Sequence, residues 1–245
     1  MPDSHSAPTA LEHGHSQQEI DARLSQPPGR GDLRDIVYGA IDGSITTFAI
    51  VAGVAGAGLS PFVIVALGVA NVLADGFSMA AGNYSATKAE LDNINRLRKV
   101  EERHIALNPE GERRELRTIL AQKGLSGEVL EGAVAQLSAQ RERWIATMLE
   151  GEYGLASVDP HPLRAALVTF AAFLIAGLIP LLPFLIGWGE AFSASVGLTL
   201  LGFFAIGTLK SRWSLSSWWR SGLETLAIGS MAAGIAFVVG SLFHM

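Results

Sequence analysis

The sequence predicts an all-α integral membrane protein with five transmembrane helices and a cytosolic three-helix domain between the second and the third. Three observations support this fold class. Apolar residues make up 49% of the 245 residues and charged residues only 17%, and the mean hydropathy of +0.32 is too high for an ordinary soluble domain of this size. Several uncharged stretches approach or exceed the ~20 residues that span a bilayer. The basic residues are confined to three segments.

The uncharged stretches give the number of spans. The runs 165–189, 191–209 and 225–243 each predict one helix. The apolar run 36–84 is too long for a single span, and Gly-Leu-Ser-Pro at 58–61 interrupts it where a helical hairpin needs a turn. The two halves of this run therefore bring the total to five.

The 18 Lys and Arg residues predict the orientation. All of them lie in the N-terminal segment that ends at Arg34, in 88–164 or in 210–220, and five spans place these three segments on the same side of the membrane. Because loops rich in Lys and Arg remain in the cytosol, we expect a cytosolic N-terminus and a non-cytosolic C-terminus. The chain has no Cys, which excludes disulfides, zinc–thiolate sites and iron–sulfur ligation.

The chain is expected to divide into four parts: a disordered tail over 1–31, the first two spans over 32–86, a cytosolic helical domain over 87–160, and spans three to five over 161–245. The first span begins near Leu33. Pro162 opens the third span, and Pro180 and Pro183 should kink its far end. Glu224, near the start of the last span, is either a carboxylate at a pathway mouth or an ion-pair partner of Lys210 or Arg220, and the ion pair is favoured.

Three helices are predicted in the cytosolic domain. The second span has no breaker before Leu107 and should continue out of the membrane as a stalk. Asn108 followed by Pro109 is typical of a helix start, and Gly124 can end that helix. Ser126 is expected to cap a third helix that runs to about residue 150.

The first two spans carry ionisable groups in their interior. Asp35 lies at the edge of the first span, and Asp42 lies on the same stripe roughly 10 Å further along the helix. In the second span, Asp75 and Met79 share a stripe with Asn71, Ser78 and Gly82, which is expected to face inward.

An ionisable group at bilayer depth costs roughly 3 kcal/mol or more unless it faces a cavity or a partner, so Asp42 and Asp75 are candidates for function. Met79 adds a soft sulfur nearby. The alternative is that these acids hydrogen-bond neighbouring helices, that Gly39-x-x-x-Gly43 is a packing notch and that Met79 fills the core.

The predicted cytosolic helices carry a second group of possible ligands. They are Glu101 and His104 on the stalk, Glu112 and Glu115 on the next helix, and Met148 and Glu152 on the third. Spacings of three or four residues place each set on one helical face. Carboxylates with at most one imidazole and one thioether suit labile binding of a divalent first-row metal such as Fe²⁺ or Mn²⁺, with zinc or cobalt as competitors.

These glutamates allow two other interpretations. Glu101-x-x-His104 has the spacing of di-iron bundles, but those need the motif twice and it occurs once here, which argues against an oxidase centre. The glutamates could also form a solvated helical face and pair with neighbouring arginines.

Several motifs resemble those of the vacuolar iron transporter family. They are IDGSITTFAIVAGVAGAG at 41–58, ANVLADGFSMAAGNYSATKAE at 70–90, PEGERREL at 109–116, GLS at 124–126, RERWIATMLEGEYGL at 141–155 and SGLETLAIG at 221–229. The resemblance covers nearly everything after residue 32. It implies a five-helix homodimer that exchanges cytosolic Fe²⁺, and often Mn²⁺, for protons, with a metal-binding helical domain between spans two and three.

The resemblance also implies roles for individual residues. The transport acid of the first span falls on Asp42 and the sulfur ligand of the second on Met79. The cytosolic ligands fall on Glu101, Glu112, Glu115, Met148 and Glu152. The chain departs from the family pattern at His104, where a glutamate is common, and at Leu149, where a second methionine is common. A histidine can still bind metal when neutral, but it makes the site less anionic and more sensitive to pH.

The expected function is proton-coupled export of Fe²⁺, with Mn²⁺ as a second substrate, along a pathway through Asp35, Asp42, Asp75 and Met79. The partners expected are divalent metal ions, protons, the lipid bilayer and a second copy of the chain, without a resident cofactor or nucleic acid. We expect the cell membrane in a prokaryote and the vacuolar membrane in a eukaryote. The alternative is a membrane-anchored metal sensor or buffer, and an enzyme ranks below both because no nucleophile and base constellation occurs.

Overall fold

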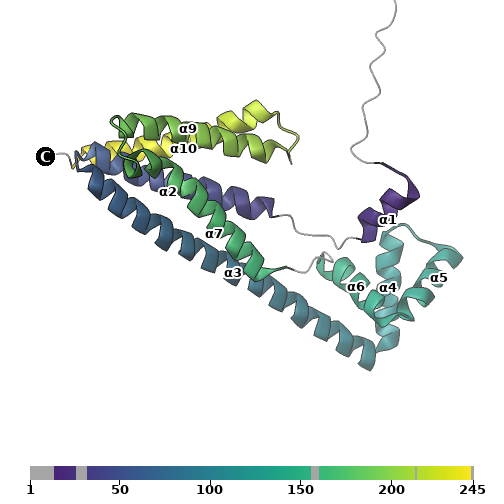
Figure 1. The fold of residues 1–245 in the computed structure, drawn as a ribbon. Helices are drawn as coiled ribbons and strands as arrows, with labels where there is room; N and C mark the ends of the chain where they lie inside the picture. The colour runs from purple at the N-terminus through teal and green to yellow at the C-terminus, as the bar shows by residue number, and fades with distance from the viewer. Residues whose placement is uncertain (1–13, 26–31, 156–159, 213, 244–245) are drawn as a thin grey trace, which may run out of the picture. The chain divides into compact units, whose positions relative to one another are not determined.

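The computed structural model describes residues 14–25, 32–155, 160–212 and 214–243, and these residues form helices and connecting turns without strands (Figure 1). The prediction of an all-α chain is therefore confirmed for this part. The chain forms two compact units, one made of residues 1–30 and 98–159 and the other of residues 31–97 and 160–245. Helix α3 contributes residues to both.

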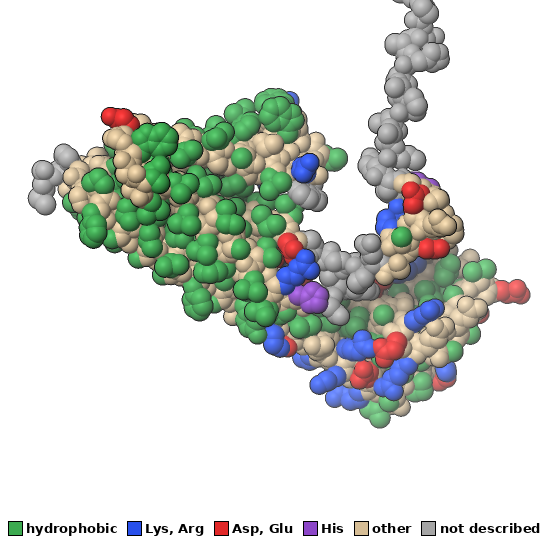
Figure 2. Space-filling view, in the orientation of Figure 1, with side chains coloured by type: hydrophobic (Ala, Val, Ile, Leu, Met, Phe, Trp, Pro, Cys, Tyr) green, Lys and Arg blue, Asp and Glu red, His purple; other side chains and the backbone are tan. Residues whose placement is uncertain are grey.

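Five helical segments among the described residues are long and apolar enough to cross a membrane, as predicted. They are α2 (Leu33–Gly56), α3 (Pro61–Leu107), α7 (Pro162–Leu178) with its continuation through η1 (Ile179–Leu181) and α8 (Leu182–Leu185), α9 (Ala191–Ser211) and α10 (Trp218–Ser241). On the face shown in Figure 2, hydrophobic side chains cover most of the unit that these spans build. Such a surface is suited to lipid rather than water.

The prolines shape the third span as predicted. Pro162 occupies the first turn of α7, where its missing N–H is not needed. Pro180 lies in the 3₁₀ turn η1, and Pro183 lies in the short helix α8. Because a proline inside a helix removes a backbone hydrogen bond, the regular α-helix ends at Leu178, two residues before Pro180, and a short α-helix begins again at Leu182 with Pro183 in its first turn.

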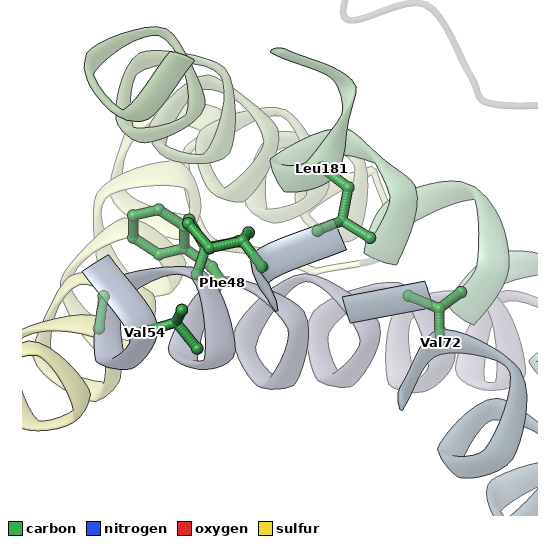
Figure 3. Close-up of a cluster of buried hydrophobic side chains, with 7 residues drawn as sticks. Phe48, Val54, Val72 and Leu181 are labelled. Carbon is green, nitrogen blue, oxygen red and sulfur yellow. The ribbon is translucent and has the colours of Figure 1, made fainter. Parts of the chain in front are cut away.

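Helix α2 is the centre of this unit and packs against α7, α9 and α10. An apolar cluster joins it to α3 and to η1, with Phe48 and Val54 from α2, Val72 from α3 and Leu181 from η1 (Figure 3). Leu181 is fully buried. These contacts hold the first two spans beside the kinked end of the third.

The two glycines of the Gly39-x-x-x-Gly43 motif bring α2 and α7 together backbone to backbone. A Cβ atom at Gly39 would overlap the carbonyl oxygen of Thr169, and one at Gly43 would overlap that of Phe173. The interpretation of this motif as a packing notch is therefore confirmed. Thr169 and Phe173 are themselves fully buried in the seam.

The packing face of α3 differs slightly from the stripe that the sequence predicts. Small and apolar side chains make the contacts: Val72 and Ala80 are buried, and Gly76 lies against Phe173. Asn71, Asp75 and Met79 are only partly buried, and Ser78 and Gly82 are exposed. The polar stripe lies at the edge of the contact face because helices in a bilayer approach each other most closely through small residues.

The other unit contains α1 (Gln17–Ser25), the last turns of α3, α4 (Pro109–Gln122), α5 (Gly127–Ser138) and α6 (Arg141–Tyr153). Two features differ from the predictions. The helix expected from residue 126 to about 150 is broken, because Gln140 has an extended backbone that separates α5 from α6. The tail expected to be disordered contains the exposed helix α1, and residues 1–13 and 26–31 lie outside the described part.

The start and the core of α4 follow the sequence closely. The side-chain oxygen of Asn108 accepts a hydrogen bond from the N–H of Gly111 at 3.1 Å, which satisfies one free donor of the first turn. The helix ends before Gly124, whose φ of +93° favours glycine. Its apolar face packs with α5 and α6 in a cluster made of Leu116, Ile119, Leu120, Val134, Trp144 and Met148.

The close contact between α2 and α7 predicts a strong effect of Gly39→Ala. The added methyl group would have to displace the backbone of α7, so we expect a loss of about 1–3 kcal/mol of stability despite the better helix propensity of alanine. Gly197→Ala in α9 is the matched control, because a Cβ there meets nothing within 4 Å. The check is thermal unfolding of both variants in detergent, and an unchanged midpoint for Gly39→Ala would contradict the seam.

Candidate functional site

The membrane-spanning unit brings two of the predicted acids together. Asp42 lies nine residues into α2 and Asp75 lies on the neighbouring helix α3, both partly buried. Their carboxylates are near enough to each other to interact electrostatically. Within the described residues, no Lys or Arg forms an ion pair with either of them. Met79 lies one helical turn beyond Asp75 and is also partly buried.

Asp35 lies in the first turn of α2 and is held by a residue that the sequence analysis missed. The side-chain amide of Asn83 on α3 donates a hydrogen bond to Asp35 Oδ1 at 3.0 Å. The same amide reaches Thr169 Oγ1 on α7 at 2.7 Å. Asp35 is therefore part of a polar junction of three helices.

A second group of acids lies in the other unit, where the end of α3 meets α4 and α6. Glu101 is fully buried, and Glu112 is 4% exposed. Glu101 Oε1 accepts a hydrogen bond from the phenol of Tyr153 at 3.0 Å. The second carboxylate oxygen of Glu101 and that of Glu112 are buried without a hydrogen-bond partner among the described residues. Unpaired buried carboxylate oxygens are costly, so this pair needs a proton or a cation.

The electrostatics of Glu112 reflect this crowding. Burial, together with the nearby carboxylates of Glu101 and Glu115, raises the pKa of Glu112 to about 7, and the Glu152 carboxylate acts in the same direction. Burial and the hydrogen bond to Glu101 raise the pKa of the Tyr153 phenol, so it remains a donor. At neutral pH, Glu112 is therefore balanced between a protonated and a charged form.

The remaining predicted ligands occupy different environments. His104 is half exposed, with Nδ1 lying 3.5 Å from Glu112 Oε1. Glu115 and Glu152 are exposed at the rim of the buried pair. Met148 is fully buried in the apolar cluster of this unit. Leu149, at the second position that departs from the family pattern, is also buried.

Four basic residues of this unit pair with other glutamates. Arg113 pairs with Glu110, Arg117 with Glu131, Lys123 with Glu150, and Arg98 with Glu102 and Glu142. Among the described residues, no Lys or Arg pairs with Glu101, Glu112, Glu115 or Glu152. The interpretation of these four acids as members of a salt-bridged surface therefore does not hold for the structure.

The ligand groups are close neighbours but do not form a finished coordination shell. Within the described part of the chain, no three His, Asp or Glu side chains converge tightly enough to hold one ion. Two buried carboxyl groups with exposed acids and an imidazole at the rim can still gather a hard divalent cation once the side chains turn toward it.

Sequence reasoning missed Asn83 and Tyr153 for physical reasons. Tyr153 continues the buried stripe of α6 through Ile145 and Leu149, which indicates an apolar core. The available signal was that a phenol at the end of such a stripe needs a hydrogen-bond partner. Asn83 lies one helical turn beyond Met79 on the same side of α3, so its spacing was an available signal. Its role nevertheless depends on contacts with α7, and those contacts can be seen only in the folded chain.

Comparison with known proteins gives consistent matches over most of the chain. The family model described as the VIT family matches residues 33–241. A protein named vacuolar iron transporter 1 from Arabidopsis thaliana is 35% identical over 238 residues, covering 96% of this chain and 92% of that protein. Vacuolar iron transporter 2 from Oryza sativa subsp. japonica is 32% identical, covering 84% of this chain and 85% of that protein.

A more distant match points the same way. A protein named vacuolar iron transporter from Toxoplasma gondii is 31% identical, covering 87% of this chain and 74% of that protein. The family-model match extends across all five apolar helices and across α4, α5 and α6, including Glu101 and Glu112. The chain therefore belongs to the vacuolar iron transporter (VIT) family.

Proposed function

We propose that this protein transports divalent metal ions across a membrane, as a proton-coupled antiporter that exports Fe²⁺, and also Mn²⁺, from the cytosol. The observation that carries the proposal is the pair of Asp42 and Asp75, two neighbouring carboxylates inside membrane-spanning helices without a basic partner among the described residues. The relatives named vacuolar iron transporter support the choice of metal.

The coupling to protons rests on one site that serves two ligands. A carboxylate within the bilayer is stable when it is protonated or when it is paired with a cation, and costly when it is neither. Metal binding at Asp42 and Asp75 therefore displaces protons, and protons arriving from an acidic far side favour release of the metal. The thioether of Met79 adds a soft ligand that favours Fe²⁺ over Ca²⁺ or Mg²⁺.

The acids around Glu101 and Glu112 have a different task in this proposal. They collect the ion in the cytosol, with His104, Glu115, Met148 and Glu152 as the further ligands, and the ion then passes to Asp35 and to Asp42. The buried carboxylate oxygens without partners support a cation at this place. A rim made of carboxylates and an imidazole suits a metal ion that must leave the site again.

The protein is further proposed to work as a homodimer. In a single chain the polar edge of α3 is only partly covered: Asp75 is half buried, and Ser78 and Gly82 are exposed. Leaving this edge in lipid would be costly. A second copy that covers it would form a pathway shielded from lipid between the two chains.

The orientation and the membrane remain proposals from the sequence. The segment 88–164 is proposed to lie in the cytosol and the C-terminus on the other side, because all basic residues fall on one side of five spans. The membrane is the vacuolar membrane in a eukaryote and the cell membrane in a prokaryote. A membrane-anchored metal sensor would have no use for interacting carboxylates inside its anchor, which disfavours that alternative.

Asp42→Asn tests the coupling. The substitution keeps the size and hydrogen-bonding capacity of the side chain but removes both the charge and the proton-binding group, so metal flux and proton movement should fall to background together. A hydrogen-bonding role alone would cost on the order of 1 kcal/mol and leave transport intact. The measurement uses proteoliposomes that contain a metal-sensitive dye and a pH-sensitive dye.

The controls separate this result from misfolding. Asp92→Asn, which removes a charge from an exposed position on α3, should transport at the parent rate. Met79→Leu conserves volume and should slow flux or alter metal preference while proton coupling persists. If folded Asp42→Asn still moves metal and protons at near the parent rate, the proposed mechanism is wrong. If the parent protein binds metal but moves none, the sensor alternative is supported.

The raised pKa of Glu112 predicts pH-dependent metal binding. Because a proton occupies this carboxyl below about pH 7, it competes with the metal, and Mn²⁺ affinity should be on the order of tenfold weaker at pH 6.0 than at pH 7.5. Titration calorimetry on the detergent-solubilised protein measures this change. Glu112→Gln should weaken binding and flatten the pH dependence, whereas Glu131→Gln, at an exposed acid paired with Arg117, should leave both unchanged.

The absence of cysteine in the parent sequence allows a direct test of orientation. A single cysteine at the exposed position Ser126 should react with a membrane-impermeant maleimide only after the cells are permeabilised, because this position is proposed to face the cytosol. A cysteine at Glu190, between α8 and α9, should react from the outside in intact cells. Labelling of Ser126→Cys in intact cells would show that the proposed orientation is inverted.

A further inference from the structure

Asn83 forms the junction of three membrane-spanning helices. Its Nδ2 carries two hydrogens and lies within hydrogen-bond distance of three acceptors: Asp35 Oδ1 on α2 at 3.0 Å, Thr169 Oγ1 on α7 at 2.7 Å and the carbonyl oxygen of Ala165 on α7 at 3.3 Å. Its Oδ1 accepts a hydrogen bond from Thr87 Oγ1 one turn further along α3 at 3.4 Å. Both ends of the amide are therefore engaged.

The partners fix the orientation of this amide. In the reversed orientation the amide oxygen would face the carboxylate oxygen of Asp35 and the carbonyl oxygen of Ala165, neither of which can donate a hydrogen bond, so these two acceptors fix the orientation. Thr169 is fully buried, and its hydroxyl oxygen accepts the hydrogen bond from Asn83 there. Because Gly39 has no side chain, α2 packs closely against the carbonyl oxygen of the same Thr169. This contact keeps α2 and α7, which carry the partners of Asn83, together.

The junction engages only one of the two carboxylate oxygens of Asp35. Within the described residues, Asp35 Oδ1 has a hydrogen-bond donor while Oδ2 has none. A carboxylate held through one oxygen by an outer partner has its second oxygen directed and its rotation restricted, which is how hydrogen-bonded neighbours prepare metal ligands. Residues of α3 and α7 therefore restrict the rotation of a carboxylate that belongs to α2.

We propose that Asn83 is a positioning residue, whose amide orients the Asp35 carboxylate to receive the metal ion as it enters the membrane-spanning unit. This inference rests on the proposed function, because Asp35 is the entry ligand only if the chain transports metal. A purely structural Asn83 would join the helices equally well, so the test must measure more than folding.

Asn83→Leu, which keeps the approximate size and removes the amide, separates the two roles. If Asn83 positions Asp35, the metal concentration for half-maximal transport should rise about tenfold, with the maximal rate within about twofold of the parent. Thr169→Val, which removes an anchor of the amide, should shift the half-saturating concentration in the same direction by a smaller factor. Mn²⁺ uptake into proteoliposomes over a range of concentrations gives both parameters.

Ser195→Ala is the matched structural control. It removes another buried hydrogen bond between membrane-spanning segments, from Ser195 Oγ to the carbonyl oxygen of Pro180 at 2.6 Å, away from Asp35. It should lower the thermal midpoint while the half-saturating concentration stays constant. If Asn83→Leu behaves like Ser195→Ala, with lower stability and unchanged half-saturation, Asn83 is only structural. If Asn83→Leu fails to fold, an unchanged half-saturation in Thr169→Val overturns the proposal.

Asp35→Asn distinguishes failure of this inference from failure of the proposed function. If Asp35→Asn transports with the half-saturation of the parent, Asp35 is not an entry ligand and the proposed pathway is wrong at that point. If Asp35→Asn is impaired and Asn83→Leu is not, only the positioning role is wrong. When both are impaired, the double variant should be no worse than Asp35→Asn alone, because the amide then has no carboxylate to orient.

Discussion

The cost of keeping a carboxylate away from water governs both functional regions of this chain. Helical backbones satisfy their own hydrogen bonds in a bilayer, but an acid such as Asp42 has no comparable internal solution. In the other unit, Glu101 is fully buried with one oxygen lacking a donor. A basic neighbour would neutralise these groups, yet no arginine or lysine of the described residues forms an ion pair with Asp42 or Glu101. In the proposed function, a proton or a metal ion from solution completes each region.

The scaffold around these acids is built from small side chains. Gly39 and Gly43 let α2 and α7 meet at their backbones, and Gly76 lets Phe173 lie against α3. This arrangement places the polar residues of α3 at the edge of its contact face, where they are neither exposed to the whole bilayer nor sealed in the core. A carboxylate at such an edge can remain reachable by an ion while neighbouring helices provide its hydrogen bonds.

Most of the fold could be predicted because it depends on local signals. Uncharged runs define the spans, Pro162, Pro180 and Pro183 define the shape of the third, and Asn108 starts α4. The break before α6 could not be predicted, since Ser138-Ala139-Gln140 contains neither proline nor glycine; in the fold, α5 and α6 each pack against α4. The ion pair favoured for Glu224 is present with Lys210 at 3.3 Å, because opposite charges at the ends of consecutive spans meet naturally.

The acidic residues of the candidate site could be predicted from the sequence, but the residues that hydrogen-bond to them could not. Spacing alone identifies Asp42, Asp75 and the cytosolic glutamates, because an acid inside an apolar run or on a shared helical face is visible in one dimension. Spacing cannot show that Tyr153 reaches Glu101 across 52 positions of sequence, or that Asn83 reaches Thr169 across 86. Such contacts depend on three helices at once, and they decide which oxygen of an acid is held.

The backbone seam between α2 and α7 also affects how mutational sensitivity should be interpreted in this protein. At Gly39 and Gly43 even one methyl group meets a carbonyl oxygen of the opposite helix. Both positions should therefore be as intolerant of replacement as Asp42 in a saturation scan scored by transport, although glycine offers no side chain to an ion. Along α2, a position can therefore be intolerant either because the helices pack closely there or because its side chain binds the ion. A separate measurement of the amount of folded protein is needed to distinguish these two causes.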